Sequence, residues 1–168
     1  MNGLIDTIAS AIWFILPAYF ANAAPVLLGG GAPLDMGKKF LDGRRIFGDG
    51  KTIRGFACGL VVGTIVGILQ GIASASLREY LLLGFLLALG ALLGDLASSF
   101  IKRRLGIERG GAAPGLDQLS FVVVALLLAS PVNLPSWQVI AVILIITPPI
   151  HLATNFIGYK LGLKDRPY

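Results

Sequence analysis

Charged residues are scarce in this chain, and that scarcity decides its class. They make up 14% of the 168 residues, whereas a soluble domain carries roughly 25%. Hydrophobic residues reach 55% and the mean hydropathy is +0.81, so too few polar side chains remain to cover a soluble surface. A water-soluble fold is therefore excluded, and an integral membrane protein is indicated. At this length we expect one membrane-embedded domain over residues 1–168, with no room for a second.

Cysteine and histidine are each present once. The single Cys58 excludes a disulfide within the chain, and we expect it to pack as a small apolar residue. The single His151 is expected to act as a hydrogen-bonding strut rather than as a metal ligand or a base. No lysine or arginine precedes Lys38, so the basic start of a secretory signal is missing. The first apolar segment is therefore predicted to stay as a membrane helix.

Five apolar segments predict an all-α, polytopic membrane protein with five transmembrane helices. Four segments reach the roughly 20 residues that a spanning helix needs. The fourth covers only about 21 Å at ~1.5 Å per residue, so it either extends into its flanks or spans a thinned region. The predicted helices lie at about 7–30, 55–76, 80–101, 117–130 and 137–159.

Basic residues gather on one side of these segments. Thirteen of the 14 lysines and arginines fall in the loops 31–54 and 102–116 or in the C-terminal tail, and Arg78 alone falls on the other side. The positive-inside rule then places these loops and the C-terminus in the cytoplasm and the N-terminus outside. We expect a multi-pass protein of the cell membrane. The basic surface either binds an anionic partner or only orients the chain.

Glycines recur every four residues in the second segment. They are Gly55, Gly59, Gly63, Gly67 and Gly71. Such a stripe lets helix backbones approach closely in lipid, or it leaves a groove for a lipid chain, and the sequence leaves both readings open. Gly90 and Gly94 continue the pattern on the third segment, where they permit a close approach of the fourth.

Polar side chains inside the apolar segments converge on the predicted cytoplasmic side. Charged groups there are costly and usually mark function. On the third segment Asp95 lies seven residues before Lys102, so about 10 Å inside the helix end. Spacings of three and four put Asp95, Ser98, Ser99 and Lys102 on one face. The other converging residues are Asn22, Asp117, Thr147, His151, Asn155 and Tyr159.

The loop before the second segment contains Gly48-Asp49-Gly50-Lys51-Thr52. It is not a P-loop, because that pattern needs glycine where Arg45 stands. A glycine-flanked Lys-Thr at a helix start still offers a backbone nest, a hydroxyl and a cation, which suits a polyphosphate, although a simple helix cap explains it equally well. Together with Asp95 and Asp117 as hard oxygen ligands for Mg²⁺, it predicts phosphate chemistry at a membrane surface.

Four blocks of sequence carry a family resemblance. They are PAYFANAAP at 17–25, DMGKKFLDGRRIFGDGKTIRG at 35–55, GDLASSFIKRR at 94–104 and PGLDQLSF at 114–121. Together they resemble the CDP-archaeol synthases over nearly the whole chain. The last two blocks are also distantly similar to the signature of bacterial phosphatidate cytidylyltransferases, which has an acid, serines and Lys-Arg, then Pro-Gly and a second acid.

The resemblance implies a CTP-dependent cytidylyltransferase of phospholipid biosynthesis. It would make CDP-archaeol and pyrophosphate from CTP and 2,3-di-O-geranylgeranylglyceryl phosphate. Asp95, Asp117 and Lys102 would be catalytic, and the two aspartates would hold Mg²⁺ as the cofactor. The nucleotide would contact Lys51, Thr52, Arg54, Asn22, Ser98, Ser99 and Arg103. The partners are CTP, the isoprenoid ether lipid phosphate and membrane lipid, with no nucleic acid, and the site faces the cytoplasm.

Two other functions are compatible with parts of the pattern. A transporter or channel for an anionic phosphate-containing solute fits converging polar groups and glycine-rich helices, but the internal repeats common in transporters are missing. A CDP-alcohol phosphotransferase shares Asp42-Gly43, yet Ile46-Phe47 stands where that family's pattern has Ala-Arg. We rank both below the cytidylyltransferase.

Overall fold

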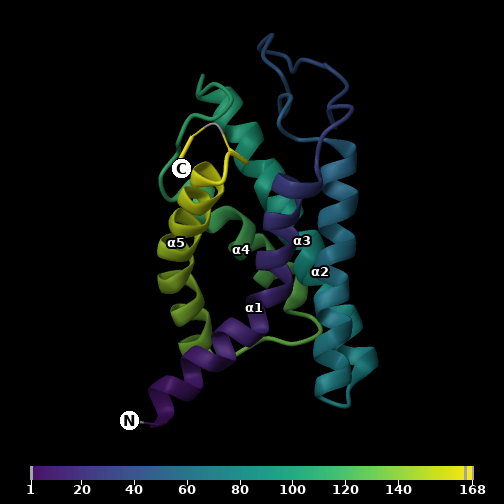
Figure 1. Ribbon diagram of the computed structural model, residues 1–168, viewed down its shortest axis with the longest axis vertical. Coiled ribbons are helices and arrows are strands. Elements are labelled where there is room, and N and C mark those ends of the chain that lie inside the picture. Colours follow the sequence, from purple (N-terminus) through teal and green to yellow (C-terminus); the bar gives the residue numbers. More distant parts are fainter. Residues whose placement is uncertain (1, 165, 168) are drawn as a thin grey trace.

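The computed structural model describes residues 2–164, 166 and 167, and these form a bundle of five helices (Figure 1). The helices are α1 (Asn2–Leu28), α2 (Ile53–Ala73), α3 (Leu77–Arg104), α4 (Leu116–Ala129) and α5 (Trp137–Lys160). They coincide with the five predicted segments apart from a few residues at their ends. Four are long and apolar enough to cross a membrane, and α4 is a shorter apolar helix of 14 residues. The all-α membrane fold is thus confirmed.

The third helix forms the centre of the bundle and the fifth lies at its edge. Half of the most apolar 18-residue window of α3 is buried inside the protein, whereas 17% of the corresponding window of α5 is buried. The core joins α1, α3 and α4 through side chains such as Ile15, Leu87 and Val122, all fully buried. Most of the surface of α5 therefore faces outward, toward lipid.

The glycine stripe of α2 is filled by neighbouring helices. All five of its glycines are buried. A Cβ on Gly63 would lie 2.8 Å from the carbonyl oxygen of Pro17 in α1, and one on Gly67 would lie 2.7 Å from the Cα of Gly84 in α3. The stripe thus serves close helix packing. The alternative prediction of a lipid groove along it is wrong, because backbone from α1 and α3 occupies that space.

Two further glycines bring α3 against α4. A Cβ on Gly90 would lie 2.8 Å from the carbonyl oxygen of Val124, and one on Gly94 would lie 2.6 Å from the Cα of Phe121. Real Cβ atoms do not approach backbone so closely, so the two helix backbones meet directly. This confirms the close approach that the sequence predicted, and it fixes where the first turn of α4 lies along α3.

The bend in α1 is supported from α2. Pro17 has no N–H, so the carbonyl of Trp13, four residues earlier, loses its helical partner. The side-chain amide of Gln70 in α2 donates a hydrogen bond to that carbonyl over 2.6 Å, and Gln70 is itself buried. An unpaired carbonyl in an apolar bundle would be costly. Figure 1 shows the N-terminal half of α1 inclined to the rest of the helix.

Candidate active site

Both long loops and the C-terminal tail lie at one end of the bundle, at the top of Figure 1. We call it the loop end; it comprises residues 29–52, residues 105–115 and the tail after Lys160. The short connections 74–76 and 130–136 lie at the opposite end. Arg78, at the start of α3, therefore stands apart from the other basic residues, as the sequence predicted.

The first loop is organised around one buried carboxylate. The side chain of Asp35 is 0% exposed. It accepts hydrogen bonds from the backbone N–H groups of Gly37, Phe47 and Gly48 over 2.9–3.1 Å and pairs with the guanidinium of Arg45. Burial by itself raises the pKa of this carboxyl, but the hydrogen bonds from Arg45 and the three amides outweigh it and hold the pKa well below its usual range. The Gly48 amide of the predicted phosphate nest thus binds an internal anion.

A second set of contacts docks this loop on the end of α3. The guanidinium of Arg104 lies over the rings of Phe40 and Phe100, 4.9 and 4.8 Å from their centroids. It also pairs with Asp42 at 3.1 Å and donates to the carbonyl of Arg45 over 2.6 Å. Cation–π contacts and hydrogen bonds of this kind hold a surface loop in one place. The first loop and the end of α3 therefore hold their functional side chains in fixed relative positions.

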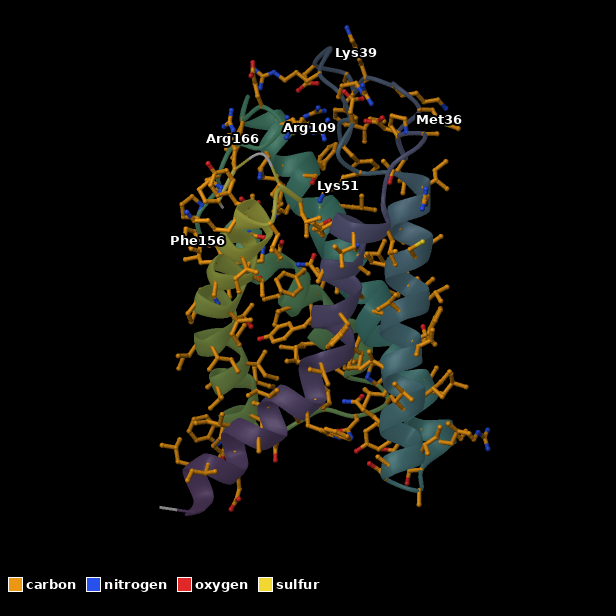
Figure 2. The ribbon with its side chains drawn as sticks, viewed as in Figure 1. Met36, Lys39, Lys51, Arg109, Phe156 and Arg166 are labelled. Atoms are coloured by element: carbon orange, nitrogen blue, oxygen red, sulfur yellow. The ribbon has the colours of Figure 1, made fainter. Side chains whose placement is uncertain are left out.

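Lys51 and Asp95 form the first charged pair of the site. The ammonium of Lys51, at the end of the loop, lies 2.6 Å from a carboxylate oxygen of Asp95 in the middle of α3. Both side chains line a small pocket of ≈ 40 Å³ together with Pro25 of α1 and Gly50 and Thr52 of the loop. Figure 2 shows Lys51 against the bundle and Lys39 at the far tip of the loop. The structure thus joins two predicted site residues that are 44 positions apart.

Asp117 is the centre of the second charged group. It accepts from the ammonium of Lys102 at 2.9 and 3.0 Å, from the hydroxyl of Ser98 at 3.1 Å, and from the backbone N–H of Ala113 at 2.8 Å. The Lys102 side chain is 13% exposed and that of Asp117 22%. One carboxylate thereby ties α3, the second loop and the first turn of α4 together.

The remaining predicted residues differ in their surroundings. Thr52 is the N-cap of α2, where its hydroxyl accepts from the N–H of Gly55 over 3.1 Å, so the capping reading of this residue holds. Arg54 is exposed on the first turn of α2 and is not among the residues that line the pocket. Ser99 is buried in α3. Asn22 is half-buried on α1, three residues before the pocket residue Pro25.

Arg103 carries an unsatisfied polar atom beside the loop. Its Nε is buried without a hydrogen-bond partner among the described residues. The same atom lies 3.8 Å from the position that a Cβ would take on Gly48, and the Nε of Arg109 lies 3.6 Å from the equivalent position on Gly50. Two arginines therefore flank the glycines that precede Lys51, and an anion there would satisfy the Nε of Arg103.

Sequence reasoning missed the position of Lys164, in the tail after the fifth helix. Lys164 donates a hydrogen bond to the side-chain oxygen of Asn155, and Asn155 is buried and bonded to the Nδ1 atom of His151 at 3.3 Å. The spacing of His151 and Asn155 placed them on one face. The signal for Lys164 was Gly162, two residues earlier, which favours a reversal of the chain after α5.

The donor set of the site fits Mg²⁺. Asp95 and Asp117 supply hard carboxylate oxygens, and this ion needs only one or two carboxylates when substrate phosphates complete its shell. Within residues 2–164, 166 and 167, no group of three or more His, Cys, Asp or Glu side chains gathers to hold a metal alone. Each aspartate instead has a lysine partner. The site suits a cation brought together with a phosphate ligand.

Comparison with known proteins gives a consistent result. A family model described as CarS-like, CDP-archaeol synthase, matches residues 4–168. The chain is 52% identical over 170 residues to the CDP-archaeol synthase of Thermococcus gammatolerans, covering 99% of each chain. It is 53% identical over 173 residues to that of Pyrococcus horikoshii, covering 100% of this chain and 99% of the relative. With the protein of that name from Methanocaldococcus jannaschii it shares 46% identity over 167 residues, 93% of this chain and 94% of the relative.

A solved structure also shares this fold. It is described as an intramembrane enzyme for archaeal membrane lipid biosynthesis, with a TM-score of 0.82 and 45% sequence identity. The match covers 88% of this chain and 94% of the other. The chain therefore shares its fold with an intramembrane enzyme of archaeal membrane lipid biosynthesis.

Proposed function

This chain belongs to the CDP-archaeol synthase family, an enzyme family of nucleotidyltransferases, and from that premise we propose its substrates, cofactor and site. An oxygen of 2,3-di-O-geranylgeranylglyceryl phosphate attacks the α-phosphorus of CTP. The bond from that phosphorus to the bridging oxygen breaks, and pyrophosphate leaves. The products are CDP-archaeol and pyrophosphate. The transporter alternative finds no support, because the relatives compared are synthases.

The observation that carries this proposal is the meeting of two lysine–aspartate pairs at one end of the bundle. Lys51 lies against Asp95, and Lys102 lies against Asp117. Phosphoryl and nucleotidyl transfer depend on positioning and on neutralising phosphate charge. The loop end offers cations for the phosphates and carboxylates for a metal ion within one cluster.

The lysines and arginines bind and orient the triphosphate in this proposal. Lys51 exchanges its contact with Asp95 for a phosphate oxygen, and Arg103 and Arg109 receive the terminal phosphates beside Gly48 and Gly50. Asp95 and Asp117 would hold Mg²⁺, which when bound neutralises charge on the phosphates and on the departing pyrophosphate. Ser98 keeps Asp117 oriented through its hydroxyl. The small size of the pocket means that Lys51 moves to admit a nucleotide.

No general base is needed for this reaction. The second pKa of a phosphate monoester is about 6, so the attacking oxygen is already ionised near neutral pH. His151 is therefore not required as a base, and its ring contacts the side chain of Asn155. The basic residues of the loop end support an orientation toward the cytoplasm, where CTP is available.

A direct assay tests the function. Purified protein in detergent or vesicles, given labelled CTP and the unsaturated ether lipid phosphate, is expected to form labelled CDP-lipid and pyrophosphate. Excess EDTA should abolish this activity, and added Mg²⁺ should restore it. Solute flux through vesicles without CDP-lipid formation would contradict the proposed reaction. Full activity in EDTA would contradict the cofactor.

The Lys51→Ala variant tests the nucleotide site. Loss of a charge-assisted contact is expected to raise the KM for CTP about 10-fold or more, because Lys51 leaves Asp95 for a phosphate. Lys39→Ala, which removes an exposed lysine at the far tip of the same loop, is the matched control and should behave as the wild type. Steady-state kinetics at saturating lipid measures both. An unchanged KM in Lys51→Ala would place the triphosphate elsewhere.

A further inference from the structure

The chain reverses direction after α5 and returns toward the bundle. Gly162 adopts a φ of +71°, a conformation that glycine accepts without strain. Its N–H donates to the carbonyl of Tyr159 at 3.0 Å, and the N–H of Leu163 donates to that of Gly158 at 2.9 Å. This pattern closes a helix and turns the next residues back along it. Lys164 is therefore directed back onto α5 rather than into solvent.

Several contacts fix the Lys164 side chain. Its Cγ and Cδ lie 3.6 and 3.5 Å from the position that a Cβ would take on Gly158, so the aliphatic stem lies across a bare stretch of α5. Its ammonium donates to the side chain of Asn155, which is buried and bonded to His151. Arg166 adds a bond to the carbonyl of Gly110 in the second loop at 3.3 Å. The tail thus packs against both α5 and the second loop.

Among the described residues, Lys164 differs from Lys51 and Lys102 in having no carboxylate partner. Lys51 and Lys102 each pair with an aspartate, whereas the hydrogen-bond partner of Lys164 in the described structure is a neutral amide. Burial lowers the pKa of Lys164, and the neighbouring positive charge of Lys51 lowers it further. The charges of Asp95, Asp117 and Lys102 also act on it, so this ammonium shares the field of the site. An anion bound beside the ammonium of Lys164 would stabilise its positive charge.

The position of Lys164 on the α5 side favours the lipid phosphate as its ligand. The triphosphate contacts proposed above come from the α2 side, through Lys51 and the arginines beside its loop. Lys164 comes from α5, on the side of the bundle opposite α2 (Figure 1). Since α5 is the least buried of the four long helices, a lipid can keep its chains in the bilayer beside α5 while its head reaches the site.

We propose that Lys164 binds the phosphomonoester of the lipid acceptor, held ready by Asn155. This assignment rests on the proposed cytidylyltransferase function. It makes the C-terminal tail a binding element for the acceptor and leaves the nucleotide to the first loop. The lysine–phosphate contact brings the attacking oxygen to the α-phosphorus from the α5 side, and no bond to Lys164 itself forms or breaks.

The test compares the KM values for the two substrates in Lys164→Gln. We expect the KM for the lipid phosphate to rise about 10-fold or more, with the KM for CTP changed less than about twofold. Lys164→Arg should recover part of the loss because it restores the cation. Lys160→Ala is the matched control: it removes an exposed lysine of the same helix end that lies over Phe156, and it should leave both KM values unchanged. Thermal unfolding in detergent checks that each variant is folded.

A second variant keeps Lys164 and changes its partner. Asn155→Asp gives the ammonium a carboxylate, and the KM for the lipid phosphate should again rise while that for CTP stays. An unchanged lipid KM in either variant, or a rise for CTP alone, would overturn the assignment of Lys164. Failure of the wild-type protein to make any CDP-lipid would instead overturn the proposed function, so the two failures are distinguishable.

Discussion

Replacing Asp95 or Asp117 with asparagine is expected to abolish turnover. Each variant keeps the shape of the side chain and removes the negative charge. If the two aspartates hold Mg²⁺, losing one carboxylate removes a ligand at the place where phosphate charge must be neutralised, and we expect kcat to fall at least about 10²–10³-fold. Steady-state rates of CDP-lipid formation over a range of Mg²⁺ concentrations measure the loss.

The two variants should differ in stability. Asp117 joins Lys102, Ser98 and the N–H of Ala113, so Asp117→Asn leaves a partly buried ammonium without its charge partner and should also lower the unfolding temperature. Asp95 contacts Lys51, whose side chain is more exposed than that of Lys102 (28% against 13%), so Asp95→Asn should unfold close to the wild type. Glu79→Gln, an exposed acid at the opposite end of α3, is the control for loss of charge. Full activity in either aspartate variant would refute the metal assignment.

Gly94→Ala is expected to lower both stability and activity, although it adds only one methyl group. The new Cβ would lie 2.6 Å from the Cα of Phe121 and 2.9 Å from the carbonyl carbon of Ser120. Both are backbone atoms that have no other rotamer, so α3 and α4 must separate. Overpacking of this kind costs typically about 1–3 kcal/mol.

The effect on activity follows from what lies beside Gly94. Asp95 is the next residue, and Asp117 stands three residues before Ser120, so separation moves one carboxylate relative to the other. A displacement of about 1 Å can cost roughly 10²-fold in rate. Gly3→Ala, where a Cβ meets nothing within 4 Å, is the matched control. Unfolding temperature and turnover of the two variants decide the point; a wild-type result for Gly94→Ala would show that the contact with α4 is dispensable.

The fold could be predicted from the sequence because its signals are local. Long apolar runs specify the helices, and a four-residue glycine spacing specifies the faces that meet. The spacing from Asp95 to Ser98 and Lys102 placed these side chains on one face of α3. The contacts of Asp117 with Ser98 and Lys102 confirm this for those two residues. The prediction of a lipid groove was wrong for a related reason. The glycine spacing shows that one face of α2 has no side chains, but it does not show that α1 and α3 pack into that face.

The internal contacts of the loop end could not be predicted. Lys51 meets Asp95 across 44 positions, and its location depends on how residues 29–52 fold. That conformation rests on Asp35, whose carboxylate collects amides from residues up to 13 positions away, a pattern with no periodicity to reveal it. The position of Lys164 depends on the chain reversal at Gly162, which is a single-residue signal. The roles of these residues toward CTP, lipid and Mg²⁺ remain predictions for the experiments above.

Asp35 also determines how the enzyme responds to acid. Its pKa in the folded protein lies below the ordinary value of about 3.9, so below that value the unfolded loop takes up protons more readily than the folded one. The stability that this carboxylate contributes is therefore complete above about pH 4 and is lost as the pH falls through the folded pKa. Between pH 5 and 8 Asp35 stays ionised, so proton uptake by this carboxylate does not disturb the loop that carries Lys51. Under the proposed mechanism, a rate that falls below about pH 6 would then report protonation of the acceptor phosphate, a property of the substrate and not of this loop.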